Sequence, residues 1–254
     1  MKLHNRIVGE GGFPLVILHG LFGFSDNWQT HAKKLSSYFK IILIDLRNHG
    51  HSPWSDDFSY QVMVEDVSEL LTSLQIQKCI LLGHSMGGKV AMHFAQKYPE
   101  KLEKLIVVDI GTKSYPMHHQ HILEGIHAIK TDQLSNRKEA EEILEQHIES
   151  DGVRQFLLKN LYWKEKGQLA WRMNIKVLEE QMPEILSAVP EKIVKTPTLF
   201  IRGELSNYIL DDDFQEIQDV FPDSDLLTIE NAGHWVHAEA PERFINEILN
   251  FTLR

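Results

Sequence analysis

Two kinds of hydrophobic pattern alternate along the first 110 residues of the chain. Short runs of consecutive apolar residues are typical of buried strands, and such runs occupy residues 14–18, 40–46, 78–82 and 102–108. Stretches with apolar residues every three or four positions are typical of helices, and these occupy residues 26–38, 60–74 and 86–97. Ser25 or Asp26 is expected to cap the first helix. Apolar strands that alternate with helices predict a parallel sheet covered on both faces.

This alternation stops at Gly111. We find no convincing strand pattern in residues 111–194, where helix-like stretches such as 138–149 and 175–182 stand among scattered His, Met and aromatic residues. The stretch is too long for a loop, so we expect a helical insertion that forms a lid over one edge of the sheet. Strand and helix patterns resume at residues 197–202, 211–221, 225–229 and 241–253. The prediction is an α/β core of residues 1–110 and 195–254 with a lid of residues 111–194.

The composition places the chain among globular proteins and limits its partners. It has 254 residues, of which 43% are hydrophobic, and this excludes the disordered and low-complexity classes. A chain of this length can bury a substantial core. The formal net charge is −10 and no basic block is present, so nucleic acid and anionic lipid are poor partners.

The cellular location is predicted from three further features. Cys79 is the only cysteine, so no disulfide can form within the chain, which favours a reducing compartment. No apolar region follows the first six residues, so we expect no cleaved signal. No stretch approaches the roughly 20 apolar residues that span a bilayer. We expect a cytoplasmic protein that does not insert into membranes, and nothing in the sequence predicts its oligomeric state.

A glycine-rich motif, Gly-His-Ser-Met-Gly-Gly at residues 83–88, lies between a predicted strand and a predicted helix. A serine at a sharp strand-to-helix turn needs small neighbours, and Gly83, Gly87 and Gly88 supply them. Such a turn exposes the Ser85 hydroxyl at the top of the sheet, beside the free N–H groups of the helix N-terminus. We therefore interpret Ser85 as a nucleophile rather than as part of a plain glycine-rich turn.

A serine hydroxyl needs a base to take its proton. His234, in the run Ala-Gly-His-Trp, follows the last predicted strand and precedes the last predicted helix. This places it at the sheet edge where ligands bind in open α/β folds. It also follows Ser85 in the chain order that such a turn requires. His237 is the alternative, but we expect it to pack at the final helix, so His234 is the predicted base.

The carboxylate that would orient His234 is ambiguous. Its usual place is the loop after the next-to-last strand, where this chain has Ser206. The aspartates at residues 211–213 come soon afterwards, but helix capping would explain them. Asp109 ends another predicted strand at the same edge of the sheet. We favour Asp109 and keep Asp211 and its neighbours as the alternative, with Ser206 hydrogen-bonding near the acid and His234.

The loop His-Gly-Leu-Phe-Gly at residues 19–23 follows the first predicted long strand. With a serine turn of this kind, one backbone N–H of that loop and the N–H of the residue after the nucleophile bind the oxyanion. This predicts Leu21 and Met86 as backbone donors whose side chains only line the pocket. His19 is expected to hold the loop.

The remaining patterns concern metals, cofactors and the substrate pocket. Asp45, His49 and His51 share a polar turn, but no second cluster with ligand spacing accompanies them, so we predict no metal site. Neither a dinucleotide-binding glycine motif nor a phosphate-binding loop follows the first strand, so no cofactor is expected. Six aromatic residues are candidates to line an acyl pocket: Phe22, Trp28, Tyr162, Trp163, Tyr208 and Trp235.

Together these motifs resemble the α/β-hydrolase superfamily over nearly the whole chain. The runs at residues 46–50, 83–89, 152–158 and 233–239 make it look most like the small bacterial YbfF-type esterases. That resemblance implies that Asp109 is the triad acid and that Ser206 accompanies the triad. It also implies hydrolysis of carboxylic esters, with acyl-CoA thioesters as a second candidate substrate class.

The primary hypothesis is a serine hydrolase that forms an acyl-enzyme on Ser85 from a small-molecule ester or thioester. A second hypothesis is a lyase or carbon–carbon hydrolase that uses the same triad, because a fold does not determine a reaction. A third is a ligand receptor with a vestigial triad. Serine at position 85 argues against the dehalogenase and epoxide-hydrolase branches of the superfamily, which carry an aspartate there.

Overall fold

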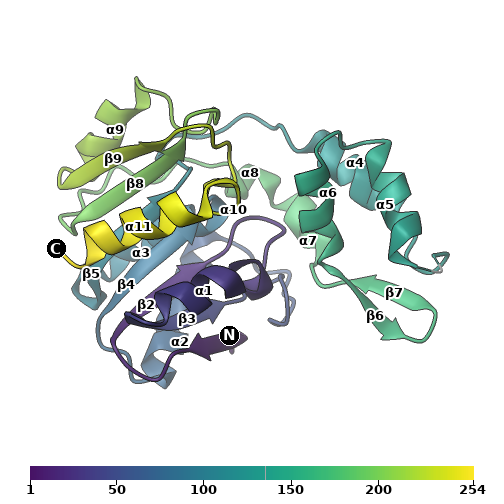
Figure 1. The fold of residues 1–254 in the computed structure, drawn as a ribbon, viewed down its shortest axis with the longest axis horizontal. Helices are drawn as coiled ribbons and strands as arrows, with labels where there is room; N and C mark the ends of the chain where they lie inside the picture. Colours follow the sequence, from purple (N-terminus) through teal and green to yellow (C-terminus); the bar gives the residue numbers. More distant parts are fainter. Residues whose placement is uncertain (135) are drawn as a thin grey trace.

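The computed structural model describes residues 1–134 and 136–254. Its centre is a seven-stranded sheet with the spatial order β1-β3-β2-β4-β5-β8-β9 (Figure 1). All neighbours pair in parallel except β1 and β3, which are antiparallel. The expected, mostly parallel sheet is therefore confirmed. The strands are β1 (Asn5–Val8), β2 (Phe13–Leu18), β3 (Phe39–Ile44), β4 (Cys79–His84), β5 (Leu102–Val108), β8 (Thr198–Gly203) and β9 (Ser224–Ile229).

Helices cover both faces of this sheet (Figure 1). One face packs against α1 (Gln29–Leu35) and α11 (Pro241–Thr252), and the other against α2 (Tyr60–Ser73), α3 (Met86–Lys97) and α9 (Asp213–Val220). In β2, Leu15 and Ile17 point into the first core, whereas Val16 and Leu18 point into the second. Burial on both faces explains why the strands have uninterrupted apolar runs. Every helix within the described part of the chain is too short or too polar to cross a membrane.

The first predicted helix differs from its prediction. Instead of one helix over residues 26–38, the chain forms the 3-10 turn η1 (Ser25–Trp28) followed by α1. The expected cap at Ser25 or Asp26 is also wrong, because the N-cap position of η1 is held by Phe24. The Ser25 N–H donates to Asp45 Oδ1 at 2.6 Å. A contact with the loop after β3 thus fixes this helix start, which local sequence does not reveal.

Residues 111–194, called the helical segment below, stand to one side of the sheet (Figure 1). The prediction that this stretch contains no strand is wrong, because β6 (Leu161–Glu165) and β7 (Gln168–Trp171) form an antiparallel hairpin. These strands are short and half-exposed, so they lack the apolar runs of the central sheet. The helices of the segment are α4 (Gln120–Ala128), α5 (Arg137–Glu145), α6 (Asp151–Leu158), α7 (Ile175–Glu180) and α8 (Met182–Ile185).

Lys89 of α3 ties both ends of the helical segment to the core. Its side chain is fully buried. Its ammonium donates to the carbonyls of Thr112 at 3.3 Å, Lys113 at 2.6 Å and Ser187 at 2.7 Å. The first two carbonyls lie at the start of the segment and the third lies after α8. One side chain therefore fixes the two connections through which the segment joins the core.

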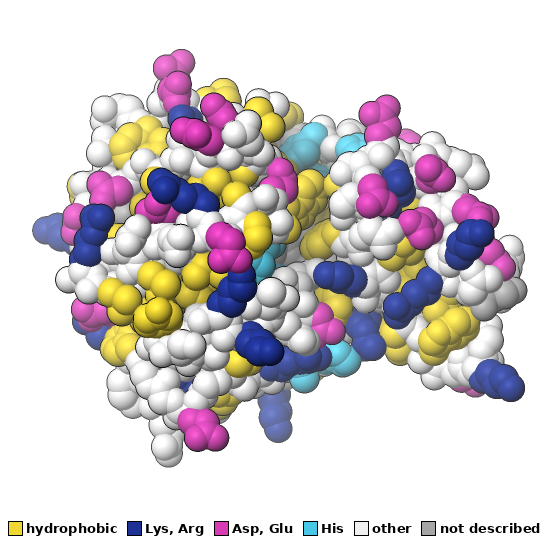
Figure 2. Space-filling model, in the orientation of Figure 1, with side chains coloured by type: hydrophobic (Ala, Val, Ile, Leu, Met, Phe, Trp, Pro, Cys, Tyr) yellow, Lys and Arg dark blue, Asp and Glu magenta, His cyan; other side chains and the backbone are white. Residues whose placement is uncertain are grey.

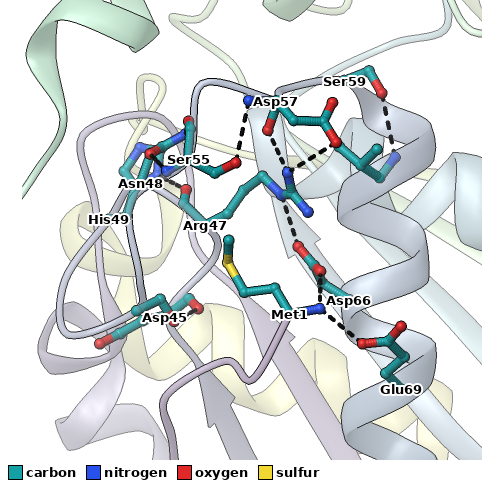
Figure 3. A network of polar contacts seen from close by, with 12 residues as sticks. Met1, Asp45, Arg47, Asn48, His49, Ser55, Asp57, Ser59, Asp66 and Glu69 are labelled. Atoms are coloured by element: carbon teal, nitrogen blue, oxygen red, sulfur yellow. Dashed lines mark hydrogen bonds and ion pairs between the residues drawn. The ribbon is translucent and has the colours of Figure 1, made fainter.

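The polar turn at residues 45–52 is held by the chain around it (Figure 3). Arg47 pairs with Asp66 of α2 at 2.7 Å, and Asp66 also binds the amino group of Met1 at 2.8 Å. The Asp45 carboxylate accepts backbone N–H groups, including that of His51 at 2.9 Å. These polar side chains bind protein groups, which accounts for a run of polar residues directly after a buried strand.

Candidate active site

Ser85 connects β4 to α3 in a backbone conformation that L-residues rarely adopt. Its φ is 53° and its ψ is −121°, and its N–H donates to the Val108 carbonyl at 3.0 Å. Such a turn is crowded. A Cβ on Gly83 would lie 2.2 Å from the Gly87 carbonyl oxygen, and one on Gly87 would lie 2.4 Å from that of His19. The expected need for small residues around Ser85 is confirmed.

His234 and Asp109 meet at the carboxyl ends of the strands. His234 follows β9 and Asp109 follows β5, and the Nδ1–H of His234 donates to Asp109 Oδ2 at 2.8 Å. Asp109 is fully buried. It also accepts the Gly203 N–H on Oδ1 at 3.0 Å and the Ser206 hydroxyl on Oδ2. Three donors therefore fix the position of this carboxylate and leave it beside the imidazole.

Two of the three alternative acids at residues 211–213 are engaged elsewhere. Asp211 pairs with Arg202, and its side chain is 87% exposed. Asp213 pairs with Lys113 at 2.5 Å. Of the carboxylates that the sequence left open, the structure brings Asp109 to His234.

Two further rings pack against His234. The Nε2–H of His84 donates to the His234 carbonyl at 2.9 Å, and the two imidazole centroids are 4.7 Å apart. Burial lowers the pKa of His84 to about 3, so this ring is neutral at physiological pH. Tyr208 stacks on His234 with centroids 4.1 Å apart. No sequence pattern predicted that His84 packs against His234, although His84 lies within the glycine-rich motif.

Two more of the histidines that the sequence singled out, His237 and His19, make contacts that hold the fold. His237 stacks on Trp28 with centroids 4.2 Å apart, and its backbone carbonyl accepts the Nε2–H of His31 at 2.7 Å. Burial lowers the pKa of His237 well below its ordinary value. The His19 ring donates to the Gly20 carbonyl at 2.8 Å and so holds its loop, as expected.

Ser85 and His234 line one cavity of about 310 Å³, called the Ser85 cavity below. The helical segment contributes Ile122 of α4 and Phe156 of α6 to its wall. Three histidines of the same segment also reach it, and no sequence motif had singled them out: His118, His119 and His121. Core and helical segment therefore enclose this cavity together.

The aromatic candidates divide into two groups. Phe22, Tyr208 and Trp235 line the Ser85 cavity. The other three lie outside its wall. Trp28 belongs to the core under α1 and α11. On the β6–β7 hairpin, Tyr162 packs against Arg172 and Trp163 is 46% exposed.

The loop after β2 also borders this cavity. Leu21 lines it, and Met86 is the first residue of α3, directly after Ser85. The Phe22 N–H is already donated to His49 Nε2 at 3.2 Å. Burial lowers the pKa of His49 to about 3, so its ring is neutral and can accept this bond. The Phe22 N–H is therefore engaged within the protein.

The sequence matches the family model of the alpha/beta hydrolase fold over residues 14–152. It is 42% identical over 249 residues to the sn-1-specific diacylglycerol lipase ABHD11 of Danio rerio, covering 94% of this chain and 78% of that protein. It is 36% identical over 239 residues to Esterase YbfF of Escherichia coli, covering 94% of this chain and 92% of that protein. A solved marine microorganism esterase is 43% identical, with a TM-score of 0.96 over 98% of this chain and 99% of that one. The resemblance inferred from the motifs is confirmed.

Proposed function

The chain belongs to the α/β-hydrolase family and is a hydrolase, and we propose that it cleaves carboxylic esters with Ser85, His234 and Asp109 as a catalytic triad. The observation that carries this proposal is the 2.8 Å bond between His234 and Asp109 at the cavity that Ser85 shares with His234. Relatives named as an esterase and a diacylglycerol lipase support an ester as the substrate.

The proposed reaction begins with Ser85. Its Oγ attacks the carbonyl carbon while His234 Nε2 takes the hydroxyl proton. Asp109 holds the proton of His234 on Nδ1 and stabilises the imidazolium that forms. The C–O bond to the leaving alcohol breaks, the alcohol oxygen takes the proton from His234, and the acyl group stays on Ser85. A water molecule, deprotonated by the same imidazole, then releases the acid and restores Ser85.

The N–H groups of Leu21 and Met86 are the proposed oxyanion donors. Met86 stands at the N-terminus of α3, where the helix dipole favours negative charge. The loop that carries Leu21 turns sharply at Phe22, whose φ is 61°. Losing one such donor typically raises the barrier by roughly 2.7–4 kcal/mol, so a firmly held loop is part of the proposal.

We further propose that the helical segment acts as a lid on a core made of residues 1–110 and 195–254. The support is the divided wall of the Ser85 cavity, in which the core supplies Ser85 and the helical segment supplies Ile122, Phe156 and Leu157. An apolar wall of this kind suits an acyl chain. Movement of the segment would open the cavity for substrate entry.

Release of p-nitrophenol from p-nitrophenyl butyrate by wild type and Ser85→Ala tests this function. We expect a fast burst followed by steady turnover in wild type, and release at the buffer rate in Ser85→Ala. Ser73→Ala, an exposed serine on α2, is the matched control and should behave as wild type. The butyryl thioester of N-acetylcysteamine belongs in the same series, because the same steps would expel a thiol.

Equal release by wild type and Ser85→Ala would contradict the triad. If wild type binds butyrate esters without cleaving them, a receptor with a vestigial triad becomes the better description. Cleavage of carbon–carbon bonds without cleavage of esters would favour the lyase or carbon–carbon hydrolase alternative.

A further inference from the structure

A second cavity lies where the helical segment meets the core, and cations dominate its wall. It measures about 350 Å³ and is called the basic cavity below. Arg137, Lys159 and Arg172 of the helical segment face Asp26 and Gln29 of the core across it. Figure 2 shows Lys and Arg side chains gathered where the hollow between the two parts opens on this face. Such a gathering stands out in a chain of net charge −10.

The single carboxylate in this wall is already engaged. Asp26 Oδ1 pairs with Arg6 at 2.8 Å and accepts the side-chain amide of Gln29 at 2.7 Å. Its charge is therefore shared with a cation outside the cavity wall. It offers little compensation to the three cations across from it.

The partners of Arg137 and Arg172 leave the charge of both guanidinium groups unbalanced. Arg137 donates to the Leu161 carbonyl at 2.6 Å. Arg172 packs over the Tyr162 ring at 4.4 Å, and its Nη1 lies 3.4 Å from His51 Nδ1. Within residues 1–134 and 136–254, no carboxylate forms an ion pair with any of the three. Positive charge that faces a cavity without a counter-charge favours the binding of an anion.

An intermediate cavity of about 530 Å³ shares wall residues with both the basic cavity and the Ser85 cavity. Lys159 lines both the basic and the intermediate cavity. Phe156, His234 and Trp235 line both the intermediate and the Ser85 cavity. Because neighbouring cavities share wall residues, the three lie next to one another, in order from Ser85 to the cations.

We propose that the basic cavity binds a phosphate at the far end of the substrate's leaving group while the acyl group occupies the Ser85 cavity. The inference rests on the proposed ester hydrolysis. The leaving oxygen must lie against His234, which returns the proton to it, and His234 also lines the intermediate cavity. The leaving group would thus extend along the series of cavities toward Lys159.

The residues that line the basic and intermediate cavities suit a phosphate in the first and a neutral linker in the second. Guanidinium groups bind phosphate through paired N–H donors, and lysine adds a compact charge. Glu239 lines the intermediate cavity, with its carboxylate bound by the N–H groups of Gly233 at 2.7 Å and Trp235 at 3.1 Å. That negative charge would repel a phosphate there, so the intermediate cavity suits a neutral linker. The reaction breaks only the acyl C–O bond, and the phosphate leaves unchanged on the alcohol.

Two matched esters test this inference: the monobutyrate of 1,6-hexanediol, and the same ester with a phosphate on its free hydroxyl. We expect wild type to show a kcat/KM for the phosphorylated ester at least tenfold above that for the neutral one, which corresponds to about 1.4 kcal/mol. The ratio of the two values is the readout, because a general loss of activity cancels in it. Added salt should lower the ratio.

Three variants locate the effect. Lys159→Gln and Arg172→Gln should each lower the ratio at least threefold, and the double variant should bring it close to one. Lys166→Gln is the matched control, since Lys166 is exposed at the β6–β7 turn and lies outside the cavity wall. It should keep the wild-type ratio.

Each other outcome overturns the inference in a distinguishable way. A ratio near one in wild type, with the neutral ester still cleaved, refutes the phosphate site and spares the esterase. A ratio that survives in the double variant places phosphate recognition elsewhere. If inorganic pyrophosphate alters cleavage of the neutral ester while the ratio is one, the cavity serves a free anion. If neither ester is cleaved, the proposed esterase function fails and the inference fails with it.

Discussion

Asp109 Oδ2 and His234 Nδ1 lie 2.8 Å apart although 125 residues separate them in the chain. The turn after β5 makes this contact, because Asp109 has a φ of 50° and its N–H donates to the Ile201 carbonyl of β8 at 2.8 Å. This places the carboxylate under the loop that follows β9. The carboxylate beside His234 therefore comes from the strand before the one whose loop carries Asp211.

Replacing Asp109 by Asn should nearly abolish ester hydrolysis. The amide retains the size of the carboxylate but neither stabilises the imidazolium nor fixes the correct tautomer. Loss of the orienting acid in a serine triad costs about 10⁴ in turnover. Turnover of p-nitrophenyl butyrate is the measurement. Asp211→Asn is the matched control and should retain wild-type turnover, and the reverse result would exclude Asp109 as the acid.

Ser206→Ala should lower kcat roughly ten- to hundredfold with little change in KM. Ser206 binds Asp109 and does not line the Ser85 cavity, so we expect it to act by positioning the carboxylate. A hydrogen bond to a charged group contributes about 1.5–3 kcal/mol. Ser206→Thr keeps the hydroxyl and should restore most of kcat. An effect confined to KM would argue against a positioning role.

Gly87→Ala should destabilise the protein by about 1–3 kcal/mol or more and remove activity. The new Cβ would meet the backbone oxygens of His19 at 2.4 Å and Leu18 at 2.6 Å, which cannot move without disturbing β2. Gly152→Ala is the control, because its nearest neighbour, Ser150 Oγ, is 3.8 Å away. Inside α6 that change should stabilise by up to about 1 kcal/mol. Urea unfolding measures both.

Lys89 should make stability rise with pH above neutrality. Burial lowers the pKa of its ammonium to about 7, whereas the unfolded chain keeps it near 10.4. Between these values the unfolded state binds a proton that the folded state has released. The free energy of unfolding therefore increases with pH, by up to about 1.4 kcal/mol per unit. Below pH 7 both states are protonated and this dependence disappears.

Urea unfolding of wild type and Lys89→Met between pH 6 and pH 10 tests this prediction. The difference between the two free energies isolates Lys89, because the other titrating groups are common to both proteins. We expect that difference to change in favour of wild type as pH rises. A difference independent of pH would mean that Lys89 stays protonated, held by the carbonyls of Thr112, Lys113 and Ser187.

Features that depend on neighbours along the chain could be predicted from the sequence. The range of α3 (Met86–Lys97) and that of β5 (Leu102–Val108) agree with their predictions, because each has strong periodicity and clear end signals. The sharp turn at Ser85 is predictable because its crowded backbone requires glycines at a fixed spacing, which is a local requirement. The β6–β7 hairpin was missed because its half-exposed strands carry no comparable pattern.

Contacts between segments that are distant in the sequence could be identified only in the folded structure. The sequence alone favoured Asp109 over Asp211 without excluding either, and the order of β5, β8 and β9 in the sheet decided which carboxylate reaches His234. The same holds for the aromatic candidates: Trp235, in the loop after β9, reaches the Ser85 cavity, whereas the helical segment carries Trp163 away from it on the β6–β7 hairpin. Periodicity and turn sterics act over a few residues, whereas a site assembled from several strand ends depends on how the strands are ordered in space.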